Sequence, residues 1–240
     1  MRRVMVLNPK GGSGKTTIAT SIASLYAALR LPTVLFDHDA QGSSTRWLRV
    51  RPSAMPEIHG VAAYRQPVGV TRAWQQRLPQ GTERVVVDTP AGVRAANLID
   101  LVRKADNIVV PVLPSHIDID AVSAFLDDLA ALEPVRLGQT KVAVVANRVR
   151  TRNVVFKDLE RFLRHVRFPF VTRLRDSQNY VRATERGLGI HDLDRRATRL
   201  DRDQWGPLLA WIEDRPVDII GECEGHEPLS HEPESFPLPL

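Results

Sequence analysis

The 240-residue sequence contains one cysteine, Cys223, and no apolar run that approaches the ~20 residues needed to cross a membrane. A single cysteine cannot form an internal disulfide, and it cannot supply the several thiolates that hold an iron–sulfur cluster. The first three residues lead directly into an apolar segment, without the pattern of a signal peptide. We therefore expect a protein of a reducing cytoplasm that has no membrane anchor.

Acidic side chains are scarce in the last third of the sequence until residue 213, where the balance reverses. Residues 141–212 carry 16 basic and 8 acidic side chains, whereas residues 213–240 carry one basic and eight acidic ones. The basic third is a candidate surface for a polyanion, although a solvated face fits the same composition. The acidic segment is also rich in proline, so we expect one domain over residues 1–212 and a disordered tail over 213–240. The tail lacks the basic amphipathic pattern of a membrane-docking helix.

The most informative stretch is NPKGGSGKTT, residues 8–17. An apolar run at residues 4–7 precedes it and predicts a buried strand. The segment after it predicts a helix, because four apolar residues share one face: Ile18, Ile22, Leu25 and Leu29. Strand, glycine-rich turn and helix N-terminus in this order are the context of a phosphate-binding loop.

Each residue type in this loop has a physical role in holding phosphate. Glycines let the backbone bend and bring its N–H groups against phosphate oxygens, and the helix N-terminus adds partial positive charge. Lys15 is expected to reach the terminal phosphates, and the Thr16 hydroxyl is expected to bind Mg²⁺. The predicted nucleotide-binding residues of the loop are Gly11, Gly12, Ser13, Gly14, Lys15, Thr16 and Thr17.

Two further predicted strands, at residues 33–36 and 84–87, end in acidic residues. Ligands of a parallel sheet gather beyond the carboxyl ends of its strands, so Asp37 and Asp88 are placed to serve Mg²⁺. Asp37 and the nearby Asp39 fit equally well as caps of a following helix. Pro90 and Gly92 punctuate a loop after Asp88 that is placed to respond to a terminal phosphate.

Strand and helix patterns alternate through the rest of the chain. This rhythm predicts an α/β P-loop NTPase fold: a mostly parallel twisted sheet with helices on both faces, in a single domain. The expected strands are 58–63, 107–112 and 141–146, and residues 111–115 are expected to form a loop at the carboxyl edge. A short helix is expected around Trp47 and Leu48. The other expected helices are one through 74–78, then 118–132, 153–166 and 203–212.

Arginine dominates the last third of the domain. Arg182 and Arg186 are four residues apart, so they share one face of a helix. Arginine forks bind phosphate oxygens well, and no base-reading motif is evident, which favours sequence-independent binding of double-stranded DNA. A solvated basic face is the alternative.

The phosphate-binding loop departs from the common pattern in two ways. Pro9 stands where a glycine is usual, and a second lysine, Lys10, precedes the glycine pair. With the DHDAQG stretch from Asp37 and the DTPAG stretch from Asp88, this loop resembles the deviant Walker A motif of the ParA/MinD family of ATPases. Ala40 replaces the usual proline of that family, which leaves the backbone there less constrained.

The resemblance covers residues 3 to about 212 and implies a ParA-type partition or positioning ATPase without an N-terminal helix-turn-helix domain. In that family ATP and Mg²⁺ hold a homodimer, and Lys10 takes the part of the lysine that touches the partner subunit's ATP. By the same resemblance Asp39 orients the attacking water, Asp37 supports the metal site and Asn147 lies near the adenine. The family's surface for nonspecific nucleoid DNA corresponds here to a region with Arg173, Arg175, Arg182 and Arg186.

The family cycle also implies partners. A ParB-like or cargo-adaptor protein triggers hydrolysis, and the cargo is a plasmid, a chromosome region, a carboxysome or another large assembly. After residue 147 the chain lacks the aspartate of the guanine-specific NKxD motif, which favours ATP over GTP. A simple loop asparagine is the alternative for Asn147.

Two other functions fit parts of the sequence. A metabolic P-loop enzyme, such as a dethiobiotin-synthetase-like ligase, needs a small-molecule pocket and no basic face. A DNA-binding protein without enzymatic activity has no use for the two predicted switch carboxylates. DNA retention that depends on ATP distinguishes the first of these from a ParA-type ATPase.

Overall fold

The computed structural model describes residues 1–65, 77–93, 95–150 and 154–215. Within these ranges the chain forms one seven-stranded sheet in the order β3-β2-β4-β1-β5-β6-β7, and every described strand pair is parallel. The strands are β1 (Arg2–Val6), β2 (Thr33–Asp37), β3 (His59–Ala62), β4 (Arg84–Asp88), β5 (Asn107–Val112), β6 (Lys141–Val149) and β7 (Phe170–Arg175).

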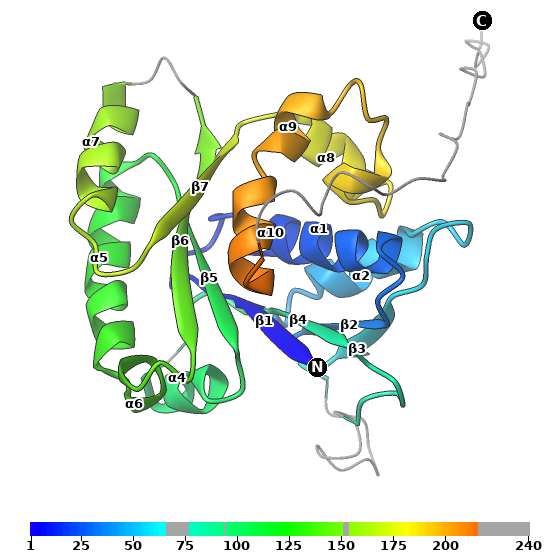
Figure 1. Cartoon of the computed structure of the whole chain (residues 1–240), viewed down its shortest axis with the longest axis horizontal. Coiled ribbons are helices and arrows are strands. Elements are labelled where there is room, and N and C mark those ends of the chain that lie inside the picture. Colours follow the sequence, from blue (N-terminus) through cyan, green and yellow to red (C-terminus); the bar gives the residue numbers. More distant parts are fainter. Residues whose placement is uncertain (66–76, 94, 151–153, 216–240) are drawn as a thin grey trace, which may run out of the picture.

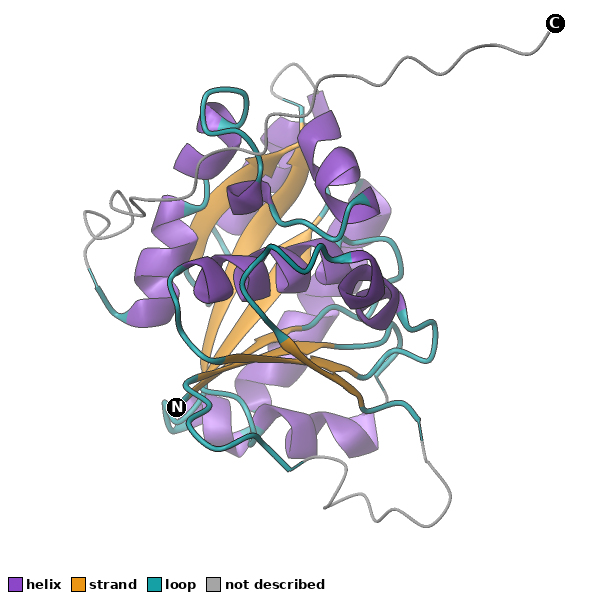
Figure 2. Ribbon diagram, turned by 90° about the vertical axis from the view of Figure 1, so that its right-hand side faces the viewer, coloured by secondary structure: helices purple, strands orange, loops and turns teal. Residues whose placement is uncertain are grey.

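Helices cover both faces of the sheet, as Figures 1 and 2 show. The larger helices are α1 (Lys15–Ala28), α2 (Ser43–Val50), α4 (Ala95–Val102), α5 (His116–Ala131), α7 (Val154–Leu163), α8 (Gln178–Glu185) and α10 (Gly206–Glu213). Shorter turns are α6 (Glu133–Arg136), η1 (Ile190–Asp192) and α9 (Arg199–Asp203). No helix of the described ranges is long and apolar enough to cross a membrane.

The two faces of the sheet build two separate apolar cores because successive strand residues point to opposite sides. In β1, Met5 packs with α4, α5 and α7, whereas Val4 and Val6 pack with α1, α2 and α10. Both sets of strand side chains are fully buried, so the strands read as continuous apolar runs. The expected three-layer α/β fold with a parallel sheet is confirmed.

Several predicted boundaries were wrong. β6 continues to Val149 rather than stopping at residue 146, because its pairing with β7 resumes at Val149 after an irregularity. Pro111 and Val112 belong to β5, so the expected loop shrinks to residues 113–115. The single closing helix expected over 203–212 is two helices, since Gly206 and Pro207 start α10 separately from α9.

Other expectations fall partly or wholly outside the described residues. Residues 74–76 of the helix expected through 74–78 are outside the described ranges. The last two residues of that prediction, Arg77 and Leu78, are described and are not helical. Of the acidic tail, Glu213 closes α10, and its carboxylate accepts a hydrogen bond from the Arg84 guanidinium at 2.9 Å. Residues 216–240 are outside the described ranges. The predicted disorder of that segment therefore stays a prediction.

Candidate active site

The glycine-rich loop joins β1 to α1, and its last position can be occupied only by glycine. Gly14 caps α1 with φ of 91°, and a Cβ there would lie 2.2 Å from the Asn147 amide nitrogen. No side chain caps the helix, so the first N–H groups of α1 point into the loop without a side-chain acceptor. Such a helix start is suited to an anion.

Lys15 extends across this loop from the first turn of α1. Its Nζ donates to the Lys10 carbonyl at 2.8 Å, and the residue is 7% exposed. Burial lowers the pKa of Lys15, and the carboxylates of Asp88 and Asp39 oppose that effect. The lysine therefore lies between the loop and the acidic residues, as the predicted contact with terminal phosphates requires.

Asp37 and Asp88 lie side by side because β2 and β4 are paired in register at these two residues. Asp88 is completely buried, and its Oδ2 accepts a hydrogen bond from the Ser44 hydroxyl at 2.6 Å. Its Oδ1 has no hydrogen-bond partner among the described residues. Burial raises the pKa of Asp88 to about 6, although the hydroxyls of Ser44 and Thr16 favour its ionised form.

Asp37 uses both carboxylate oxygens to hold nearby backbone. Oδ2 accepts from the amide and the hydroxyl of Thr45, each at 2.8 Å, and Oδ1 accepts from the Asp39 amide at 3.1 Å. It is 1% exposed. Asp37 therefore anchors the start of α2 as well as bringing negative charge to the predicted metal site.

The carboxylate and hydroxyl oxygens at this site are of the kind that binds Mg²⁺. Among the residues that the structure describes, no group of three or more His, Cys, Asp or Glu side chains is arranged to hold a metal. Mg²⁺ is usually bound through one or two carboxylates together with substrate phosphates rather than by a cage of protein ligands. The free Oδ1 of Asp88, with the Thr16 hydroxyl nearby, fits that type of site.

Asp39 and Lys10 stand at the less buried side of the site. Asp39 is half-buried, and its Oδ1 accepts from the Gln41 amide at 2.9 Å. The Lys10 ammonium lies 3.5 Å from Oδ1 of Asp118 at the start of α5, and the Lys10 side chain is 30% exposed. Sequence reasoning missed Asp118, because nothing near Lys10 in the chain indicates which helix supplies its counter-charge.

Asn147 closes the opposite side of the loop. Its amide nitrogen donates to the Ser13 carbonyl at 2.8 Å, and it lines a cavity of about 450 Å³ next to α1. β7 and α8 supply the other walls, including Asp176, Tyr180 and Thr184. A cavity of that size beside a phosphate loop suits a nucleoside. Asn147 therefore lies between the phosphate loop and the candidate base site.

The four arginines predicted to bind DNA differ in their contacts within the described residues. Arg175 is bound to the buried Asp201 and lines the cavity beside Asn147, and Arg173 pairs with Glu160 of α7 at 3.8 Å. Arg182 and Arg186 are both exposed at the end of α8. Of the four predicted residues, these two are the ones best placed for a polyanion.

The Asp88 pKa leads to a stability prediction. Its value in the folded protein is above the usual 3.8, so ionised Asp88 destabilises the fold, and stability is lost as pH rises from about 4 through 6. Asp88→Asn keeps a hydrogen-bond acceptor for Ser44 and removes the charge. We expect this variant to be about 2–3 kcal/mol more stable than the parent at pH 8, since each pKa unit is worth ~1.4 kcal/mol.

Thermal melts of the nucleotide-free protein measure this effect. The gain in melting temperature should be large at pH 8 and nearly absent at pH 3, where Asp88 is mostly protonated in both the folded and the unfolded state. Equal melting temperatures of parent and variant at pH 8 would contradict a buried, charged Asp88.

These features define a P-loop nucleotide-binding protein: a parallel sheet, an anion-binding helix start, a buried loop lysine and a carboxylate at the end of the neighbouring strand. A family model described as the CobQ/CobB/MinD/ParA nucleotide-binding domain matches residues 4–190. The chain belongs to this family, as its loop sequence indicated.

Comparisons with individual proteins agree with that assignment. The chain is 36% identical over 122 residues to maintenance of carboxysome distribution protein A of Gloeobacter kilaueensis. The aligned segment covers 49% of this chain and 52% of that protein. It therefore spans about half the length of that relative. It is 27% identical over 196 residues to the protein of the same name from Halothiobacillus neapolitanus, covering 80% and 87%. A plasmid partition protein of Borrelia burgdorferi bound to AMPPNP has the same fold, with a TM-score of 0.64, 13% identity and coverage of 88% and 99%.

Proposed function

We propose that this chain is a ParA-type ATPase that positions or segregates a large cargo. In this proposal, ATP with Mg²⁺ joins two subunits face to face, the dimer binds DNA nonspecifically, and a ParB-like or cargo-adaptor protein stimulates hydrolysis. The cargo class includes plasmids, chromosome regions and carboxysomes, and the protein works in the cytoplasm on the nucleoid. The observation that carries the proposal is the second loop lysine, Lys10, on an otherwise complete phosphate site.

Lys10 supports a dimer because its position suits a partner's nucleotide. Its ammonium is paired with Asp118 at 3.5 Å, and it keeps 30% of its side-chain surface exposed. An ion pair that is partly open to water is weak, so an incoming polyphosphate can replace Asp118 as the counter-charge. A cation supplied by a second subunit stabilises phosphate charge only after the two subunits meet, as an arginine finger does.

The remaining residues divide the work within one subunit. Thr16 and Asp88 would hold Mg²⁺, with Asp37 in support, and the metal would neutralise charge on the phosphates it bridges. The amides of residues 11–17 and Lys15 orient the phosphates, and Asp39 positions the attacking water. Asn147 contacts the nucleoside through the cavity that it lines. Because phosphoryl transfer depends mainly on positioning and charge, no nucleophilic side chain is required.

The amide of Gly92 provides a physical link between the two loops of the site. It donates to the Pro9 carbonyl at 2.8 Å, and the neighbouring Thr89 hydroxyl donates to the Val6 carbonyl at 2.7 Å. A displacement of the phosphate loop is therefore transmitted through these hydrogen bonds to the loop after Asp88. This arrangement supports the proposal that residues 89–92 respond to the terminal phosphate.

DNA binding is assigned to α8. Arg182 and Arg186 are exposed four residues apart and make no ion pair within the described residues, so their charge is available to phosphate oxygens. We expect the double variant Arg182→Ala with Arg186→Ala to weaken nonspecific binding at least ~10-fold, and to lower the slope of log affinity against log salt by up to about 2 per subunit.

The control is Arg103→Ala with Arg136→Ala, which removes the same charge from exposed positions on α4–α6. Binding to duplexes of unrelated sequence, with ATP or ADP and at several salt concentrations, measures both quantities. If the α8 variant and the control behave alike, the DNA surface lies elsewhere. If the parent itself retains no DNA with ATP, a metabolic P-loop enzyme becomes the better reading.

A further inference from the structure

Helix α2 is tied at its start to the carboxylates of the candidate active site. Thr45 donates twice to Asp37, and Ser44 donates to Asp88 at 2.6 Å. Ser44 is completely buried. Any displacement of Asp37 or Asp88 by a bound nucleotide therefore pulls directly on the first turn of α2.

The other end of α2 is tied to the turn that closes α8. The Trp47 indole N–H donates to the Leu188 carbonyl at 3.1 Å, and Arg51 Nη1 donates to the Gly187 carbonyl at 3.0 Å. The Leu188 amide in turn donates to the Ala183 carbonyl within α8 at 2.9 Å. The contact is close, because a Cβ on Gly187 would lie 2.3 Å from the Arg51 backbone nitrogen.

Asp192 joins three elements through one carboxylate oxygen. Its Oδ2 accepts from Arg51 Nη1 at 2.9 Å, from the Ser24 hydroxyl of α1 at 2.6 Å and from the Gly189 amide at 2.9 Å. The Arg51 and Asp192 side chains are only 5% and 3% exposed. A buried ion pair with this many hydrogen bonds resists separation and fixes the orientation of what it joins.

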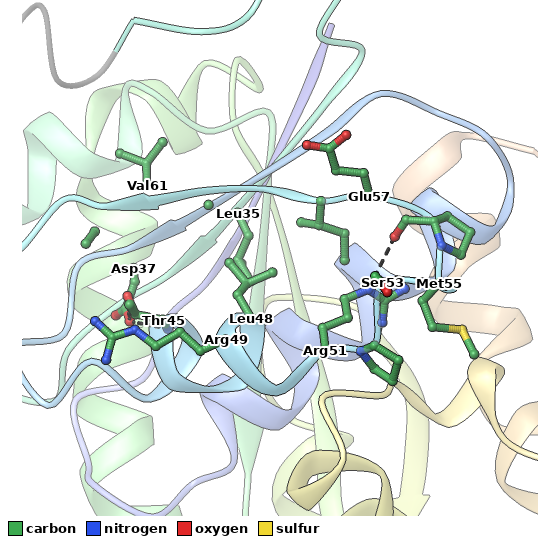
Figure 3. Close-up of a pocket in the computed structure, with 15 residues that line it drawn as sticks. Leu35, Asp37, Thr45, Leu48, Arg49, Arg51, Ser53, Met55, Glu57 and Val61 are labelled. Carbon is green, nitrogen blue, oxygen red and sulfur yellow. Dashed lines mark hydrogen bonds between the residues drawn. The ribbon is translucent and has the colours of Figure 1, made fainter.

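Between these two ends, α2 touches the sheet closely at one point, since a Cβ on Gly60 of β3 would lie 2.5 Å from Leu48 Cδ1. A cavity of about 530 Å³ lies along it, with Asp37 and Thr45 at one end, Arg51 at the other and Leu48 between them (Figure 3). Leu35 of β2 and Gly60 of β3 line the side of this cavity that faces α2. The helix is thus held by polar contacts at both ends and by Trp47 and Leu48 between them, so a displacement at one end is carried to the other.

We propose that Arg51 and Asp192 are positioning residues that transmit the state of the phosphate site through α2 to the basic helix α8. A movement of α2 toward or away from Asp37 and Asp88 is carried by the Arg51–Asp192 pair to the turn at residues 187–189, and from there to Arg182 and Arg186. The part concerning DNA rests on the proposed function, whereas the coupling of the two helices does not.

Hydrogen exchange of the full chain tests the coupling directly. With saturating MgATP instead of MgADP, backbone amides of α8 in the parent should exchange at least ~5-fold more slowly, because α2 restrains the turn that closes α8. Arg51→Lys keeps a cation and loses the planar guanidinium whose Nη1 joins Gly187 to Asp192. In this variant the difference should fall below ~2-fold while ATP affinity stays within ~2-fold of the parent.

The matched control is Arg84→Lys, which weakens the Arg84–Glu213 ion pair, also 2.9 Å long, between β4 and α10. It should keep the full nucleotide effect on α8, which separates coupling from general loss of an ion pair. Trp47→Phe removes the indole donor together with part of a buried ring system, and should give an intermediate loss. Asp192→Asn replaces Arg51→Lys if melting shows that the latter does not fold.

The results distinguish the two proposals. An unchanged nucleotide effect in Arg51→Lys, or no effect of ATP on α8 exchange in the parent, would overturn the coupling. Failure of the parent to bind DNA would overturn the proposed function and would leave the exchange experiment decisive for the coupling. If both hold, the ratio of DNA affinities with ATP and with ADP should fall toward one in Arg51→Lys and not in Arg84→Lys.

Discussion

Lys15→Ala should reduce ATP affinity at least ~100-fold, because it removes the one buried cation that lies over the phosphate loop. The Lys15 ammonium is already desolvated and sits between the loop carbonyl of Lys10 and the carboxylates of Asp88 and Asp39. Phosphate oxygens entering this space would meet a charge that has little water to lose. Titration calorimetry with MgATP measures the loss.

The neighbouring Lys10 supplies the control, since it lies on the same loop but pairs with Asp118 instead of spanning the loop. Lys10→Ala should bind ATP within ~3-fold of the parent and should fail to dimerise, because its cation is needed only by the partner subunit. A thermal melt checks that both variants fold. An ATP affinity of Lys15→Ala like that of the parent would refute the assignment of the phosphate loop.

Asp39→Ala should trap the ATP-bound dimer and lower turnover at least ~100-fold, because the attacking water loses the carboxylate that orients it. Asp39 is the least buried of the three carboxylates at the site, and its Oδ1 accepts a hydrogen bond from the Gln41 amide. Its removal therefore leaves the loop and the Asp37–Thr45 anchor in place. Phosphate release and size-exclusion chromatography in the presence of MgATP report the two effects.

His38→Ala is the matched control for this variant. His38 stands between the two aspartates, with its ring stacked near Phe36, and it has no role in the proposed mechanism. Its turnover should stay within ~3-fold of the parent. Rapid hydrolysis by Asp39→Ala would remove Asp39 from the mechanism, and a monomeric Asp39→Ala protein under MgATP would remove the sandwich dimer.

The sequence predicted the centre of the fold well because local signals agreed there. Residues 4–7, 33–36 and 84–87 are continuous apolar runs, and each leads into glycine or aspartate where a strand ends. The structure places these strands next to each other, with Asp37 opposite Asp88. Periodicity also identified α1, although burial continues around that helix from Ile18 to Ala27. The alternation of strand and helix patterns identified α5.

Sequence reasoning was less successful where tertiary contacts decide the structure. The end of β6 depends on its pairing with β7, and β7 was not assigned as a strand because its residues alternate between buried and exposed with arginines among them. Lys10 with Asp118, and Arg51 with Asp192, are pairs that are distant along the chain. A single sequence holds no local signal for such pairs. Asp118 and Arg51 therefore could not be told apart from ordinary surface charges.

The assignment of Arg175 illustrates the same limit from the opposite direction. By composition it is one of many arginines in a basic region, and it was grouped with Arg182 and Arg186. In the structure its guanidinium is committed to Asp201, which is completely buried. Arginine content predicted that this region is basic. The ion-pair partner of each arginine could be identified only from the fold.

The contact between Gly14 and Asn147 also restricts how this protein can diverge. With only 2.2 Å between the position of a Cβ at residue 14 and the amide of residue 147, neither site can enlarge alone. Shortening Asn147 would relieve the contact and would leave the φ of 91° at Gly14, so glycine at residue 14 is held by two independent constraints. Sequence change at residue 147 is therefore limited by the glycine turn that it touches, in addition to any limit set by function.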